Sequence, residues 1–250
     1  SPGSHGKDAS AGKPKISLQG MKMSKKYVAE MIIDRISASK NYLKEKYNKP
    51  GRVYCGLVHR LDRPVSGLVI FAKTDKALSR LTKQIKNREI KKIYWAIVKG
   101  MPQQHEATLR NYLRRNEKQN KSYIVPEGTI NAKLAILDYK LIGHSAGGYS
   151  LLEIELHTGR HHQIRCQMAA EGHPLLGDGK YGVNRDDKKK GYHYQALYSY
   201  RLRFDFEQNG DVLDYLSGKE EHAQLFKGSY LTNYSWGEIT LSELCGDNLF

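Results

Sequence analysis

The sequence predicts an α+β protein with a mixed, mainly antiparallel sheet flanked by helices and loops. Some segments place apolar residues at three- and four-residue spacings, as amphipathic helices do, while others are short β-branched and aromatic runs that end at Gly or Pro. The strand-like runs follow one another as hairpins and do not alternate regularly with helices. At 250 residues the chain is long enough for one full core. We therefore expect a single domain over residues 13–250, after a tag-like or disordered lead-in at 1–12.

Three segments have helical periodicity. The first runs over residues 24–47 and ends before Pro50 and Gly51. The second begins after Thr74, a residue suited to an N-cap, and extends to about Asn87. The third opens at His157 and ends at Gly172, where a left-handed cap suits glycine.

The remaining ordered segments are predicted strands. An apolar run starts at Leu68, directly after a loop, and a basic loop is expected at 114–121 within a hairpin. The other strand-like runs cover residues 90–98, 108–113, 132–142, 149–156 and 196–206.

The net charge indicates a polyanionic partner. Lys and Arg number 41 against 26 Asp and Glu, which leaves a formal charge of +15. Such a charge attracts nucleic acid phosphates without regard to sequence, and the 17 Tyr residues are suited to stacking on bases. The three cysteines have no paired spacing, and no apolar run approaches membrane-spanning length. We expect a cytoplasmic protein with no membrane association and no obligate protein partner.

The segment 56–74 carries the most informative pattern in the chain. Asp62 lies between Arg60 and Arg63, and turn-forming residues follow before the apolar run begins. Nearby cations favour the ionised form of a carboxylate, so the sequence predicts a lowered pKa for Asp62. By itself this pattern is more often a surface ion pair with a turn than a reactive group.

The order of residues in this segment favours the reactive group over the surface ion pair. His59-Arg60-Leu61-Asp62, followed by Ser66-Gly67 and a strand ending in Ala72-Lys73-Thr74, resembles the signature of the RluA-like pseudouridine synthases. A second signature of that family resembles Thr158-Gly159-Arg160-His161-His162-Gln163-Ile164-Arg165. The resemblance runs from about residue 51 to about residue 206, and no N-terminal S4-type RNA-binding segment is evident.

The resemblance implies an isomerase that converts specific uridines in structured RNA, either rRNA or tRNA, to pseudouridine without a cofactor. It implies that Asp62 is the catalytic nucleophile, that Tyr94 stacks on the flipped-out base or shuttles a proton, and that Arg165 pairs with Asp62. Arg60 is expected to face the RNA. The other candidate RNA-binding residues are His59, Arg63, Arg160, His162 and Gln163.

Other chemistry is less well supported by the sequence. His161 and His162 resemble metal ligands, but adjacent residues on a helix point to different sides and no carboxylate lies at the usual spacing, so no metal site is predicted. The main alternative is a catalytically silent RNA-binding or ribosome-assembly factor with the same fold. A glycosidase-type pair of carboxylates ranks last, because only the distant Asp178 offers a partner for Asp62.

Overall fold

The structure is a computed structural model and describes residues 54–210 and 213–222. The helix predicted over 24–47 and the lead-in predicted at 1–12 lie outside these residues. Within the described range, no helix has both the length and the apolar character needed to cross a membrane.

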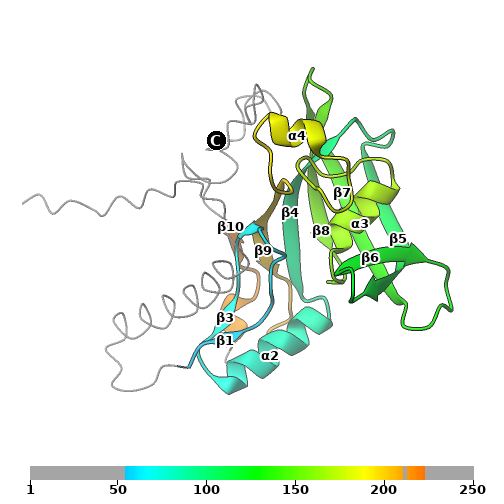
Figure 1. Ribbon diagram of the computed structural model, residues 1–250. Coiled ribbons are helices and arrows are strands. Elements are labelled where there is room, and N and C mark those ends of the chain that lie inside the picture. The colour runs from blue at the N-terminus through cyan, green and yellow to red at the C-terminus, as the bar shows by residue number, and fades with distance from the viewer. Residues whose placement is uncertain (1–53, 211–212, 223–250) are drawn as a thin grey trace, which may run out of the picture.

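A large sheet organises the described part of the chain (Figure 1). Its eight strands follow the order β10-β9-β4-β8-β7-β5-β6, with β2 beside β9. Every pairing is antiparallel except the parallel pair of β2 and β9, so the predicted mixed, mainly antiparallel α+β fold is confirmed. The strands are β2 (Ser66–Gly67), β4 (Ile90–Lys99), β5 (Glu106–Asn116), β6 (Lys121–Val125), β7 (Lys133–His144), β8 (Tyr149–Leu156), β9 (Leu197–Phe204) and β10 (Glu220–His222).

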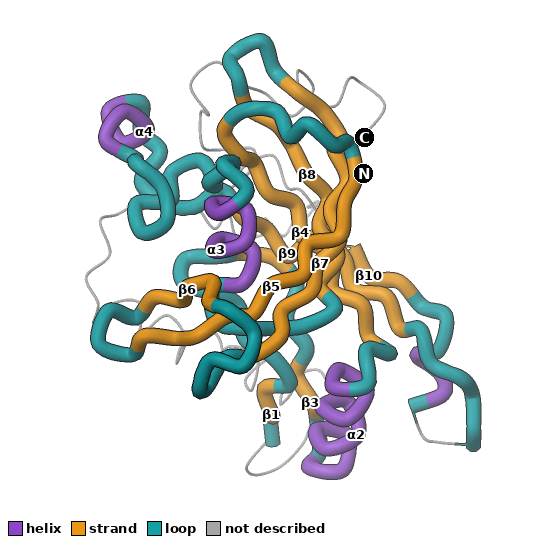
Figure 2. Tube along the Cα trace, turned by 90° about the vertical axis from the view of Figure 1, so that its right-hand side faces the viewer, coloured by secondary structure: helices purple, strands orange, loops and turns teal. Residues whose placement is uncertain are grey.

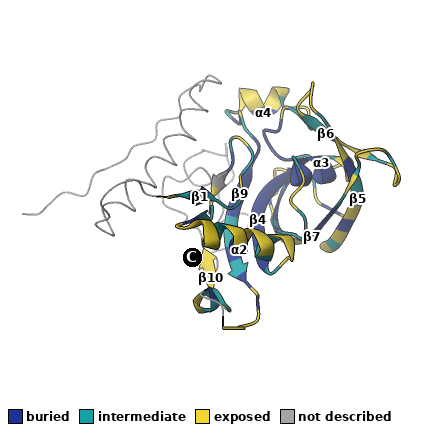
Figure 3. Ribbon diagram, turned by 90° about the horizontal axis from the view of Figure 1, so that it is seen from below, coloured by how far each residue is buried: buried dark blue, intermediate teal, exposed yellow. Residues whose placement is uncertain are grey.

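Two further short strands, β1 (Gly56–Leu57) and β3 (Phe71–Ala72), pair with each other beside α2 (Asp75–Lys86). The helix begins as predicted, because the Thr74 hydroxyl accepts a hydrogen bond from the Ala77 N–H at 3.1 Å, and it is capped by Asn87. Leu81 of α2 packs into a core cluster with Ile90 and Leu202 of the sheet. The outer surface of α2 is exposed (Figure 3).

Helix α3 (Gln163–Ala170) packs against one face of the large sheet (Figure 2). Its Ile164 and Met168 join a buried cluster with residues of β4, β5, β7 and β8. The helix begins six residues later than the predicted start at His157, because His162 takes a left-handed conformation with φ of 53° that interrupts a helix. Gly172 does adopt the expected left-handed conformation, with φ of 85°. The remaining helical elements are α4 (Arg185–Lys189) and the 3-10 turn η1 (Asp214–Leu216).

Two strand predictions need correction. The apolar run from Leu68 forms only the two-residue strand β3, since the preceding Ser66–Gly67 backbone already pairs with β9. The basic segment 114–121 is a loop only at residues 117–120: β5 continues to Asn116 and β6 begins at Lys121. Tertiary pairing extends the hairpin through residues whose charged side chains alone favoured a loop.

Candidate active site

The loop that carries Asp62 is held to the sheet by the residues that follow Asp62. The Asp62 carbonyl accepts a hydrogen bond from the Val65 N–H at 2.7 Å, and the Val65 side chain packs in the buried cluster that contains Tyr94. Gly67 has φ of 117°, and a Cβ there would lie 2.2 Å from the Ser199 carbonyl oxygen, so only glycine fits this close approach to β9. Asp62 is therefore presented from a rigid support.

Asp62 is half-buried, and burial decides its charge state. Burial raises the pKa of the Asp62 carboxyl, and the charges of Arg165, Arg60 and Lys180 oppose this only in part, while the Asp178 charge adds to it. The predicted lowering of the pKa by flanking cations is thus wrong. Arg63 is exposed and is not among the largest contributions to the shift, and removal from water outweighs the cations that are.

Arg165 is buried in α3, at 5% exposure, but its direct partner is Asp178. Its Nε and Nη2 donate to the two Asp178 carboxylate oxygens, each at 2.7 Å, which is a bidentate pair. Burial acts to raise the pKa of Asp178, but the hydrogen bonds and charge of Arg165 outweigh it and lower the pKa. Among the described residues Arg165 forms no ion pair with Asp62, so the predicted direct pairing is corrected: Arg165 acts on Asp62 through its field.

Tyr94 lies on β4, buried at 6% exposure, in the same cluster as Val65 of the Asp62 loop. Its hydroxyl hydrogen-bonds with Ser199 of β9. Burial raises the pKa of Tyr94 to about 12, and the Asp62 charge adds to the shift, so the phenol stays protonated near neutral pH. Tyr94 and Asp62 are thus close enough to interact electrostatically.

The candidate RNA-binding residues divide by exposure. Arg60, Arg63 and Arg160 are exposed, and the Arg160 Nε donates to the Leu134 carbonyl at 2.8 Å. Gln163 is buried: its Oε1 accepts from the Thr158 hydroxyl and its Nε2 donates to the Ile136 carbonyl. These bonds give Gln163 a role in fixing the loop before α3.

Two of the candidate histidines also have internal partners. His59 Nε2 accepts a hydrogen bond from the Ile70 N–H at 3.2 Å, and burial lowers the pKa of His59 to about 4. His162 is buried, its Nδ1 lies 3.1 Å from the Tyr181 hydroxyl, and burial lowers its pKa to about 3. Both rings are neutral at pH 7 in the folded protein.

The rings of His161 and His162 stack at a centroid distance of 3.7 Å. The expectation that they point to different sides of a helix was wrong, because both precede α3 and the left-handed His162 backbone turns the two rings together. No group of three potential metal ligands occurs within residues 54–210 and 213–222.

Sequence reasoning missed the contribution of the segment Gly177–Gly182. It supplies Asp178 to Arg165, and it places Lys180 near Asp62 and the Tyr181 ring 5.2 Å below the Arg165 guanidinium. The turn-rich composition of this segment was visible, but composition alone assigns no partner. The tertiary fold brings it to α3.

Comparisons with known proteins identify the family of this chain. A family model described as RNA pseudouridylate synthase matches residues 14–170. The chain therefore belongs to the RNA pseudouridylate synthase family, and the resemblance to its RluA-like members is confirmed.

Named relatives are similar to this chain in sequence, and a solved structure is similar to it in fold. Ribosomal large subunit pseudouridine synthase D of Zymomonas mobilis is 35% identical over 71% of this chain and 57% of its own. An uncharacterized RNA pseudouridine synthase of Chlorobaculum parvum is 37% identical over 68% of this chain and 56% of its own. The chain spans about half the length of several curated relatives that it matches. The structure of human RNA pseudouridylate synthase domain containing 4 has a similar fold, with a TM-score of 0.58 at 20% identity over 77% of each chain.

Proposed function

We propose that this chain converts uridines in structured RNA, rRNA or tRNA, to pseudouridine, with Asp62 as the catalytic carboxylate. The observation that carries the proposal is the convergence of three elements on one site: the Asp62 loop, Tyr94 of β4, and the Arg165–Asp178 pair of α3 and the following loop. Family membership and the charge of +15 support an RNA substrate.

The reaction breaks the bond between N1 of uracil and C1′ of ribose and forms the bond between C5 and C1′. The hydrogen on C5 is lost and N1 gains one, so atoms balance without an outside reactant and no cofactor is required. Asp62 supplies the carboxylate that attacks or deprotonates during this exchange. The fields of Arg165, Arg60 and Lys180 favour its anionic form against the effect of burial.

Recognition requires that the uridine leave the RNA stack, because C1′ and C5 are otherwise inaccessible to a loop carboxylate. Tyr94 offers an aromatic ring beside Asp62 on which the uracil can stack, or a protonated hydroxyl for proton transfer. The exposed Arg60, Arg63 and Arg160 are suited to phosphate contacts around the flipped nucleotide.

The decisive experiment substitutes Asp62→Asn, which retains the size of the side chain and removes its ability to act as a nucleophile or base. We expect pseudouridine formation in rRNA or tRNA transcripts to fall by at least about a thousandfold while RNA affinity stays within about threefold. Nucleoside analysis by mass spectrometry measures the product, and filter binding measures affinity. Modification at the wild-type rate by this variant would reject the catalytic assignment, and a wild-type chain without activity on any RNA would favour a silent RNA-binding factor.

A further inference from the structure

A lysine, Lys92, lies on the same face of β4 as Tyr94. Side chains alternate along a strand, so Lys92 points to the face of Tyr94, about 7 Å away along the chain. Lys92 is buried at 9% exposure. Its ammonium has no carboxylate or hydrogen-bond partner among the residues that the structure describes, and it is not closed off from solvent.

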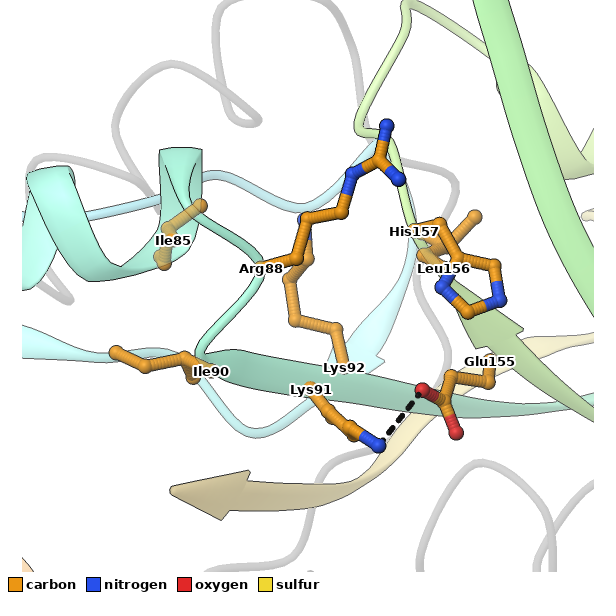
Figure 4. Close-up of a pocket in the computed structure, with 8 residues that line it drawn as sticks. All are labelled: Ile85, Arg88, Ile90, Lys91, Lys92, Glu155, Leu156 and His157. Carbon is orange, nitrogen blue, oxygen red and sulfur yellow. Dashed lines mark ion pairs between the residues drawn. The ribbon is translucent and has the colours of Figure 1, made fainter. Parts of the chain in front are cut away.

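Lys92 opens onto a pocket between the end of α2, the start of β4 and the end of β8 (Figure 4). The cavity volume is about 90 Å³, and Asp62 does not line it. Arg88 extends into this region just after the end of α2, and its left-handed backbone, with φ of 67°, belongs to the C-terminal cap of that helix. Arg88 likewise has no ion pair with any described residue.

The other charges of the pocket are already compensated. Lys91 pairs with Glu155 at 3.7 Å and with Asp205 at 3.1 Å, and His157 Nε2 lies 2.6 Å from the Asp138 carboxylate. The two cations without a carboxylate are therefore Lys92 and Arg88. A pocket with two such cations favours an anion from outside the chain.

Lys92 lies near two loops of the candidate active site, the loop before α3 and the loop that carries Asp62. A Cβ at Gly159 would lie 3.2 Å from the Lys92 Nζ, so the absence of a side chain in the loop before α3 leaves room for the ammonium. The Lys92 charge also contributes to the lowered pKa of His59, three residues before Asp62. An anion held here would lie beside the base-stacking position and outside the reacting centre.

We propose that Lys92 and Arg88 bind a backbone phosphate of the RNA adjacent to the flipped uridine. The inference rests on the proposed function for the identity of the anion, because a nucleotide stacked on Tyr94 carries its phosphates a few bonds from the base. In this arrangement Lys92, a buried residue, donates a hydrogen bond to the phosphate, and Arg88, which is exposed, contacts the phosphate from the solvent side. Both act in binding and positioning, since neither lies at the reacting atoms.

The first test uses inorganic phosphate and the full chain. In ¹⁵N NMR spectra at constant ionic strength, phosphate added in place of chloride should shift the backbone signals of Arg88, Lys92 and Gly159, and the Lys92→Met variant should lose these shifts. Shifts confined to other basic surfaces, or none up to 50 mM phosphate (roughly the scale of a single weak anion contact), would overturn the anion site.

The second test measures affinity for a synthetic RNA stem-loop with a uridine-rich loop as salt is raised. Lys92→Met and Arg88→Ala should each weaken binding about tenfold, and each should reduce the magnitude of the slope of log K against log salt by about 0.7 to 0.9, the value for one phosphate contact. Gly159→Ala should weaken binding while the charge is retained, because its methyl group displaces the ammonium. Lys86→Met, on the exposed end of α2, removes one charge outside the pocket and serves as the control.

The outcomes separate this inference from the proposed function. Wild-type affinity and salt slope in both Lys92→Met and Arg88→Ala would overturn the phosphate site even if pseudouridine is formed. Reduced slopes in these variants, with wild-type behaviour of Lys86→Met, would support the site even if no transcript contains pseudouridine. Arg88 is exposed, so its variant remains informative if Lys92→Met folds poorly.

Discussion

Replacement of Asp178 by Asn tests whether the buried pair with Arg165 supports the site. Asp178 is 1% exposed and accepts two hydrogen bonds of 2.7 Å from the Arg165 guanidinium, together with the N–H groups of Lys180 and Tyr181. Asn can keep one acceptor, but the buried guanidinium loses its counter-charge. Removal of one partner of a buried pair typically costs about 3–5 kcal/mol, and we expect the free energy of unfolding to fall by that amount.

The pH dependence of stability provides an independent measure. The pKa of Asp178 is lowered from its usual 3.8 in the folded protein, so its ionised form contributes stability that is present above about pH 4 and is lost as pH falls through the folded pKa. Asp178→Asn should lack this acid-dependent component. Because the Asp178 charge also raises the pKa of Asp62, the variant should ionise Asp62 at a lower pH.

Urea denaturation of wild type and variant between pH 3 and pH 7 (roughly the range over which carboxylates titrate) measures the loss in the free energy of unfolding and its dependence on acid. Asp186→Asn is the control, since its carboxylate is 83% exposed and pairs only with Lys189 at 3.7 Å; it should change stability by less than about 0.5 kcal/mol. A loss below about 1 kcal/mol for Asp178→Asn at pH 7, with no change in the acid limb, would refute the structural role of the pair.

Two further substitutions test the supports of the site. Gly67→Ala should reduce the free energy of unfolding by at least about 2 kcal/mol, because the new Cβ would lie 2.2 Å from the Ser199 carbonyl oxygen; an unchanged urea midpoint would contradict this packing. His162→Gln should flatten the loss of stability between pH 6.5 and 5, by about 2 kcal/mol at pH 5, since the unfolded ring takes up a proton at 6.5 and the folded ring only near 3. Identical pH profiles for wild type and variant would show that His162 is not buried as a neutral ring.

The sequence alone predicted the fold class and most elements, because local patterns encode them. Thr74 marked the start of α2 through its capping hydroxyl, and the β-branched run at 90–98 marked β4. Asp62 and Arg165 were selected by two motifs and Tyr94 by the resemblance of its strand to the family, and the fold then brought the three segments together.

Only the tertiary structure decided what those residues contact. Burial raises the pKa of Asp62 although cations flank it in sequence, since desolvation depends on how the loop packs and not on its neighbours in the chain. Arg165 pairs with Asp178, which no local spacing indicates, and Lys92 lacks a carboxylate within the described residues although the sequence shows it as one of many lysines. Motifs select the candidate residues, while their charge states and partners follow from long-range packing.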